Sequence, residues 1–280
     1  MPLNRGTGRL KFRRPSSSSS FSPSSSQSLA WFNRIGTGPL YGLSATERNA
    51  YDTMITGLVS DGVWSLLDAL YIFATNNATN ANYNLISTSY GITPVNSPSF
   101  APDVGYTGNG SSSYLNTGYL SSTGPQWGAN SCHLSVFAQN NVAQGTEVAI
   151  GCDAGTYAYI QPYVSGGNFY YDLNAGSFPN AANPMGGTKG AWVVSRTGGS
   201  AEAAYYNGNS TAFISSAVGS SAPPAQAIYI GALNNAGTAS NWSTLQISAA
   251  SMGAALTNTQ SVNLMSRVNT YLNALGVKVY

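Results

Sequence analysis

The chain has 280 residues, a formal net charge of +2, and only 7% charged residues, against roughly 25% in an average soluble domain. Its length and its hydrophobic fraction of 42% allow one sizeable core, since sandwiches of about 200 to 250 residues commonly form a single domain. No apolar run reaches the length of a membrane-spanning helix. Most of the chain also lacks the clustered basic residues that nucleic-acid binding requires, so nucleic acid is not an expected partner.

Residues 1–40 are predicted to form an extended, basic and serine-rich arm that anchors the chain to a partner. Such a composition buries too little apolar surface to fold alone, while its scattered aromatic residues can dock into another protein. A floppy tail is the alternative. The start of the chain has no apolar segment of the kind that a secretion signal needs, so we expect synthesis in a host cytoplasm without such a signal. The candidate anchoring residues are Arg5, Arg9, Lys11, Phe12, Arg13, Arg14, Phe21, Trp31 and Phe32.

Residues 41–70 are predicted to be a helical segment that packs on the rest of the chain. Ser44 and Glu47 have the spacing of a capping box, and apolar residues follow at helical intervals between Tyr51 and Val59. Asp61-Gly62 should end this helix. A second short helical piece is expected over Val63 to Asp68, before a buried strand that begins near Leu70.

Residues 71–280 are predicted to be a β-sandwich with a C-terminal helix. Short runs rich in Tyr, Val, Ile and Phe alternate with Gly, Asn, Pro and Ser clusters, as in sandwiches and barrels. Expected strands include Glu147 to Ile150 and Tyr157 to Val164, and Asn207-Gly208 is a strong hairpin signal. Thr257 and Gln260 form a second capping box for the final helix.

The sequence gives little sign of catalysis, and we expect neither an enzyme nor a cofactor or metal site. A retaining glycosidase needs two carboxyl groups about 5 to 5.5 Å apart, and no two acidic residues lie two positions apart on an expected strand. The single histidine, His133, follows Cys132 directly, so on a strand their side chains point to opposite faces. Cys132 and Cys152 are interpreted as buried free residues, with one disulfide as the alternative.

Carbohydrate binding is the functional alternative that these residues allow. Aromatic rings can stack on sugars and amide groups can bond their hydroxyls, although alternation along strands turns about half of the aromatic residues into the core. Trp242 lies in a polar loop and is a better candidate than Trp192, which we expect in the core. The candidate glycan contacts are Tyr114, Asn234, Asn235, Asn241 and Trp242.

Three segments, in order, resemble the laminin G-like (concanavalin A-like) jelly-roll superfamily. They are residues 105–118, with GYTGNGSSSYLNTG; residues 190–208, with a tryptophan strand and a Tyr-x-Asn-Gly hairpin; and residues 228–260, with closing strands before a helix start. The resemblance implies a mostly β, jelly-roll sandwich with a short helical N-terminal segment, a C-terminal helix and an extended N-terminal arm. The family's acidic calcium ligands are replaced here, so no calcium site follows.

The whole chain also resembles uncharacterised proteins of tailed phages and prophages. This resemblance implies a non-enzymatic structural protein of the virion, in capsid decoration, a collar or fibre, or the tail. Such a protein would be exposed on the particle surface, would bind other virion proteins through its arm, and would form homo-oligomers. The alternative is a carbohydrate-binding adhesin that recognises a host surface glycan. A polysaccharide depolymerase is a third reading, which lacks the acidic pair.

Overall fold

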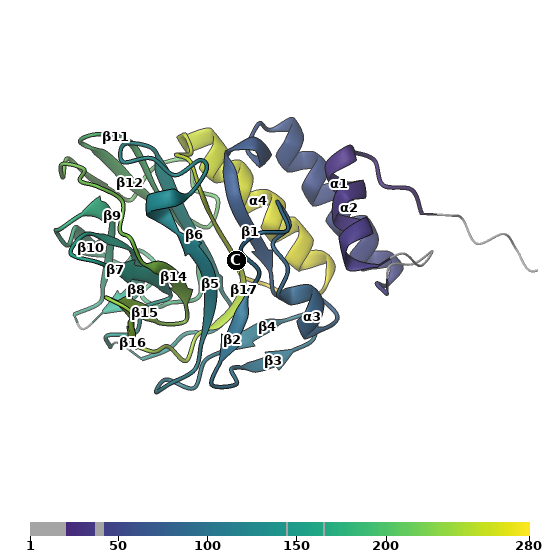
Figure 1. Cartoon of the computed structure of the whole chain (residues 1–280), viewed down its shortest axis with the longest axis horizontal. Helices are drawn as coiled ribbons and strands as arrows, with labels where there is room; N and C mark the ends of the chain where they lie inside the picture. Colours follow the sequence, from purple (N-terminus) through teal and green to yellow (C-terminus); the bar gives the residue numbers. More distant parts are fainter. Residues whose placement is uncertain (1–20, 37–41, 144, 165) are drawn as a thin grey trace, which may run out of the picture.

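The computed structural model describes residues 21–36, 42–143, 145–164 and 166–280. Two β-sheets pack face to face, and helices cover the outer face of one of them, so the molecule has three layers (Figure 1). We call the central layer sheet A and the uncovered layer sheet B. The predicted mostly β sandwich with flanking helices is confirmed.

Sheet A has eight strands within the described residues, and β17 lies near its middle. β17 pairs with β6 along one edge. Along its other edge, its first residues pair with β4 and its later residues pair with β1, and all three pairings are antiparallel. The strands are β1 (Leu67–Ile72), β3 (Ser99–Ala101), β4 (Gly105–Thr107), β6 (Cys132–Ala138), β11 (Gly190–Gly198), β12 (Ala201–Tyr206), β13 (Ile214–Ser216) and β17 (Gln246–Gly253).

Sheet B has nine strands in the described part of the chain, in the order β10-β9-β8-β7-β14-β5-β2 with the hairpin β15-β16 beside β7. Its pairs are antiparallel except β15 with β7, because the chain reverses at Gly231, which has a φ of 80°. The strands are β2 (Thr93–Val95), β5 (Tyr114–Leu120), β7 (Ile150–Asp153), β8 (Tyr157–Val164), β9 (Asn168–Ala175), β10 (Asn180–Ala182), β14 (Ala227–Ile230), β15 (Leu233–Asn235) and β16 (Thr238–Ser240).

The two cores follow from the alternation of side chains along the strands of sheet A. On β1, Ala69 and Tyr71 lie between the sheets, whereas Leu70 and Ile72 face the helices. Every residue of β1 is buried because both faces of the strand are covered. This explains why the sequence of this strand is continuously apolar apart from Asp68. Alternation of buried and exposed residues is clear on β5 of sheet B, which has one open face.

The helical layer consists of α1 (Ser26–Ile35), α2 (Ala45–Ser60) and α4 (Asn258–Ala274), and the short α3 (Ala78–Ala81) lies near β4 (Figure 1). Both predicted capping boxes are present, at Ser44 and at Thr257. α2 and α4 pack against each other, with the rings of Tyr51 and Tyr271 only 4.6 Å apart. In the described residues, no helix is both long and apolar enough to cross a membrane.

The predicted extended arm is corrected by the structure from Ser26 onward. These residues form α1, which Ser25 caps by accepting a hydrogen bond from the amide of Ser28. Trp31 and Phe32 are fully buried against α2 and nearby residues of the same chain, so they are core residues rather than partner anchors. Trp31 and Phe32 instead form the apolar face of an amphipathic helix.

Two local predictions also needed correction. The helical piece after α2 is a single 3₁₀ turn, Trp64–Leu66, and the following strand begins at Leu67 rather than Leu70. The expected strand from Glu147 includes only Ile150, where β7 begins. Glu147 instead accepts hydrogen bonds from the hydroxyls of Ser243 and Thr244, which holds its segment in a loop.

Candidate functional site

The open outer face of sheet B is rich in tyrosine. Ile150, Ile160 and Ile228 point into the core between the sheets, so their strand neighbours point outward. Outward positions on β8, β9, β14 and β5 hold Tyr157, Tyr159, Tyr170, Tyr229 and Tyr114. A tyrosine ring offers both an apolar face and a polar hydroxyl, which suits a contact surface.

A groove of about 160 Å³ lies on this face. Three aromatic rings form one side, with Phe178 packed 4.9 Å from Tyr157 and 6.2 Å from Tyr159. Phe178, in the loop between β9 and β10, is 53% exposed, which is unusual for a large apolar side chain. The remaining lining residues are Val148, Gln161, Leu233 and Asn241.

Tyr159 gives this groove a buried polar group that lacks a partner. The residue is only 4% exposed, and its hydroxyl has no hydrogen bond to any described residue. Gly151 lies opposite it on β7, and a Cβ at Gly151 would come within 2.4 Å of the Tyr159 Cβ. A buried hydroxyl without a partner is costly; Tyr159 nevertheless lies in the lining of the groove.

Asn241 is the predicted glycan contact that lines the groove. It adopts a left-handed conformation with a φ of 51°, which asparagine tolerates better than most residues. Its side-chain amide donates a hydrogen bond to the Thr146 carbonyl at 2.9 Å. Its backbone carbonyl accepts a hydrogen bond from the Val148 amide at 2.9 Å. Asn241 therefore holds the 146–148 segment against the groove while its side chain remains half-buried.

The other predicted glycan contacts are spread over the same region. Asn234 is 2% exposed and stabilises the β15-β16 turn, because it donates to the Ala227 carbonyl and accepts from the Gly237 amide. Asn235 is exposed beside that turn, and Trp242 is half-buried. Tyr114 lies farther along the face and stacks on Tyr229. The sequence analysis named Tyr114 and Asn241 but missed Phe178 and Gln161.

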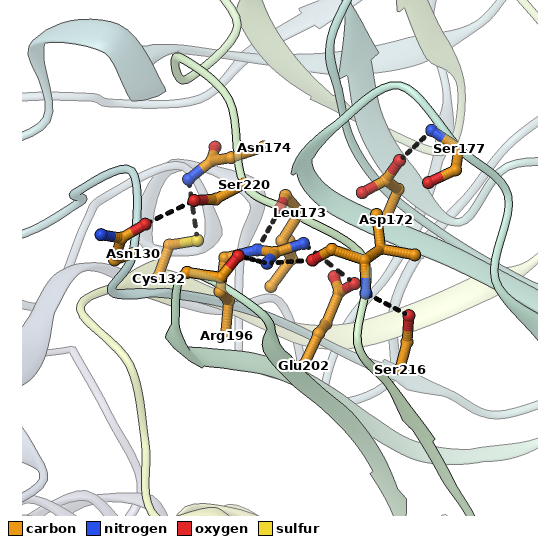
Figure 2. A network of polar contacts seen from close by, with 12 residues as sticks. Asn130, Cys132, Asp172, Leu173, Asn174, Ser177, Arg196, Glu202, Ser216 and Ser220 are labelled. Carbon is orange, nitrogen blue, oxygen red and sulfur yellow. Dashed lines mark hydrogen bonds and ion pairs between the residues drawn. The ribbon is translucent and has the colours of Figure 1, made fainter.

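A buried polar network at one end of the sandwich is the other concentration of ionisable groups (Figure 2). Arg196 is fully buried and forms an ion pair with Glu202 at 3.2 Å. Its guanidinium also donates to the carbonyls of Leu173 at 2.5 Å and Val218 at 2.9 Å. Asp172 is also fully buried, and it accepts from the Ser177 amide at 3.0 Å. Both carboxyl groups are closed off from solvent, and the network ties β9 to the segment after β13 through Arg196.

Burial raises the pKa of Asp172 to about 7, while the Ser177 amide and Arg196 act in the opposite direction. Aspartate in an unfolded chain titrates near pH 4, so the folded state binds this proton more tightly. Its stabilising contribution is therefore complete below about pH 4 and is lost as the pH rises through about 7. Asp172→Asn keeps an acceptor for Ser177 but cannot ionise. We expect this variant to gain stability relative to the wild type as the pH rises from about 5 to 8.

Urea unfolding of both proteins across this range measures the difference in free energy of unfolding. A difference that stays constant with pH would contradict the prediction. Glu202 is present in both proteins, but the Asp172 carboxylate helps to raise its pKa. The difference therefore reports the Asp172 carboxyl together with its effect on Glu202.

The single histidine has a structural role. The Nδ1–H of His133 donates to the Ala254 carbonyl at 2.6 Å, and its Nε2 accepts from the Ser251 hydroxyl at 3.0 Å. Burial lowers the pKa of His133 to about 4. Cys132 points to the opposite side, into the core between the sheets, and both Cys132 and Cys152 are buried and free. No group of three or more potential metal-ligating His, Cys, Asp or Glu side chains occurs in the described ranges.

The predicted anchoring residues lie in two places. Arg5, Arg9, Lys11, Phe12, Arg13 and Arg14 lie outside the described residues. Phe21 packs edge-on against Phe32 at 4.9 Å, and the Arg48 guanidinium lies 5.6 Å from the centre of its ring. Phe21 thus joins the helical layer of its own chain.

No family model matches the chain, and a search of curated proteins also finds no match. Solved structures match the chain at low similarity. Domain 4 of AbnA, an extracellular GH43 arabinanase from Geobacillus stearothermophilus, in complex with arabinotriose, has a TM-score of 0.44 and 15% identity, and the match covers 71% of this chain and 98% of that one.

Two other solved structures match over less of their own length. The binding domain of botulinum neurotoxin serotype D has a TM-score of 0.47 and 10% identity, with 69% of this chain and 50% of that one covered. A Trypanosoma rangeli sialidase has a TM-score of 0.48 and 10% identity, with 78% and 39% covered. This chain therefore spans half or less of both proteins.

Proposed function

We propose that the chain is a non-enzymatic carbohydrate-binding protein and that its ligand lies in the groove on sheet B. The observation that carries the proposal is a groove in which three aromatic rings, among them the exposed ring of Phe178, lie beside the polar side chains of Gln161 and Asn241. Binding sites commonly combine apolar walls with a few polar groups that fix orientation. This site meets both requirements on a face that no other layer of the molecule covers.

A sugar ring has both apolar and polar groups, and the groove is lined by both aromatic and polar side chains. The C–H groups of a pyranose form an apolar face that packs on an aromatic ring, and Phe178 offers an exposed ring for this contact. Ring hydroxyls need donors and acceptors. Gln161 lines the groove, is only partly buried, and has no side-chain hydrogen bond among the described residues, so its amide can donate to and accept from a ring hydroxyl.

Phe178→Ala is expected to weaken glycan binding about tenfold or more, because truncation of an aromatic residue at the centre of a binding site commonly costs about 2 kcal/mol, and about 1.4 kcal/mol is a factor of ten. The full chain and the variant would be tested on an array of gluco-, manno-, galacto-, xylo- and arabino-oligosaccharides, with titration calorimetry on those that bind. Leu29→Ala is the matched control, since Leu29 is 45% exposed on α1 in the helical layer. Absence of binding to every sugar, or equal binding by F178A, would refute the proposal.

We also propose that the protein is displayed on the particle of a tailed phage, where it assembles with other virion proteins and with copies of itself. The support is the low charge of the chain, at 7%, and the sequence resemblance to phage proteins. Immunogold labelling of intact particles tests this placement. Label on the head or neck would indicate a structural role, label on the tail tip or fibres would indicate host attachment, and unlabelled particles would refute the proposal.

A further inference from the structure

The geometry points to an extended, uncharged glycan chain as the ligand, lying across the strands of sheet B from Phe178 toward Tyr114. This inference rests on the proposed function and adds two properties to it. The first is that the ligand is a chain of several sugar units rather than a single terminal sugar. The second is that the units carry no acidic groups.

The first step of the argument is the register of sheet B, which aligns outward residues in a row across the strands. Tyr159 on β8 lies opposite Gly151 on β7. Gly151 lies opposite Tyr229 on β14, and Tyr229 lies opposite Asn116 on β5. Neighbouring strands are about 4.8 Å apart. Tyr159 and Tyr229 are therefore about 10 Å apart along the row, and only a glycine without a side chain separates them.

The second step is an aromatic platform at the other end of this row. The rings of Tyr114 and Tyr229 stack with their centres 4.3 Å apart and their planes 26° apart. Tyr229 is 7% exposed, whereas Tyr114 is half-buried and therefore retains more accessible ring surface. The face thus has aromatic surface at two places, around Phe178 and at Tyr114. A short sugar can contact only one of them, and a longer chain can contact both.

The third step is the distribution of charge. The nine strands of sheet B contain no lysine or arginine, and their charged residues are Asp153 and Asp172. Basic residues in the described ranges lie elsewhere: in the helices, in the buried network, or on the segments that precede β11 and follow α4. They are Arg34, Arg48, Lys189, Arg196, Arg267 and Lys278.

This distribution disfavours an acidic glycan. A uronate, sialate or sulfate group would find no cation on the strands of this face, and charged ligands are normally met by arginine or lysine. Neutral hydroxyls need no such cation.

The test is titration calorimetry of the full chain with the neutral oligosaccharide series that binds best on the array, from two to six units. We expect affinity to rise at least tenfold between three and six units. Tyr114→Ala should remove this rise and leave the affinity for three units unchanged, whereas Phe178→Ala should weaken every length. Acidic oligosaccharides of matched length should bind at least tenfold more weakly than neutral ones.

The outcomes separate this inference from the proposed function. Binding of short neutral sugars with no gain in affinity at greater length would overturn the extended ligand and leave carbohydrate binding intact. Equal or tighter binding of acidic sugars would overturn the charge argument. If no sugar of any length binds, both proposals fail. Sedimentation velocity gives a further outcome: a dimer that Phe178→Ala abolishes would assign this face to a second copy of the chain and refute the glycan.

Discussion

Trp31→Ala is expected to reduce the free energy of unfolding by about 3–5 kcal/mol, the usual cost of truncating a fully buried aromatic residue. Trp31 is 0% exposed, and its ring lies 5.3 Å from that of Tyr51 and 6.5 Å from that of Tyr83. Removal of the indole leaves a cavity between α1, α2 and the segment after α3. Equilibrium unfolding in urea, followed by circular dichroism, measures the change.

Leu29→Ala provides a matched control in the same helix. Leu29 is 45% exposed, so its replacement should change stability by no more than about 0.5 kcal/mol. If α1 were a partner-docking arm rather than part of the core, both variants would have similarly small effects on the isolated chain. Equal effects of the two substitutions would therefore contradict the assignment of Trp31 to the core.

Arg196→Met is expected to be similarly severe, at about 3–5 kcal/mol, because it leaves the Glu202 carboxyl buried without its cation. Arg196 also donates to the carbonyls of Leu173, Gly199 and Val218. These carbonyls belong to β9, to the turn between β11 and β12, and to the segment after β13. The substitution should therefore loosen three segments at once, which hydrogen exchange of their amides would show.

The double variant Arg196→Met/Glu202→Leu tests the electrostatic part of this cost. Replacing a buried ion pair by apolar side chains is often much less costly than removing one partner. We expect the double variant to be more stable than Arg196→Met alone, although the three carbonyls still lose their donor. A double variant as unstable as the sum of the two single variants would show that the ion pair contributes no coupling energy.

Much of the fold could be predicted from local sequence signals. The capping boxes at Ser44 and Thr257 fixed the starts of α2 and α4, and Asp61-Gly62 marked the end of α2. The strand from Tyr157 to Val164 was predicted with the correct bounds. These signals act within a few residues of each other, so no long-range contact was needed to interpret them.

Features that depend on distant contacts were harder to predict. α1 is a short helix in a serine-rich segment, and it is stabilised by burial of Trp31 and Phe32 against other helices, which local composition does not reveal. The groove on sheet B also depends on contacts between residues that are distant in the sequence. Phe178 joins Tyr157 and Asn241 only because β9, β8 and the chain after β16 meet on one face. Alternation could place Tyr157, Tyr159 and Gln161 on a common face, but it could not show which face was open.

The coverage of sheet A by helices has a consequence for how this protein can diversify. Side chains of sheet A pack on both sides, so a substitution there disturbs one of two cores. The side chains at the outward positions of sheet B point away from the core, and only the backbone at these positions adjoins it. Relatives of this protein should therefore accumulate substitutions at positions such as 157, 161 and 178 more rapidly than in β6 or β17, and ligand preference can change while the folded scaffold stays the same.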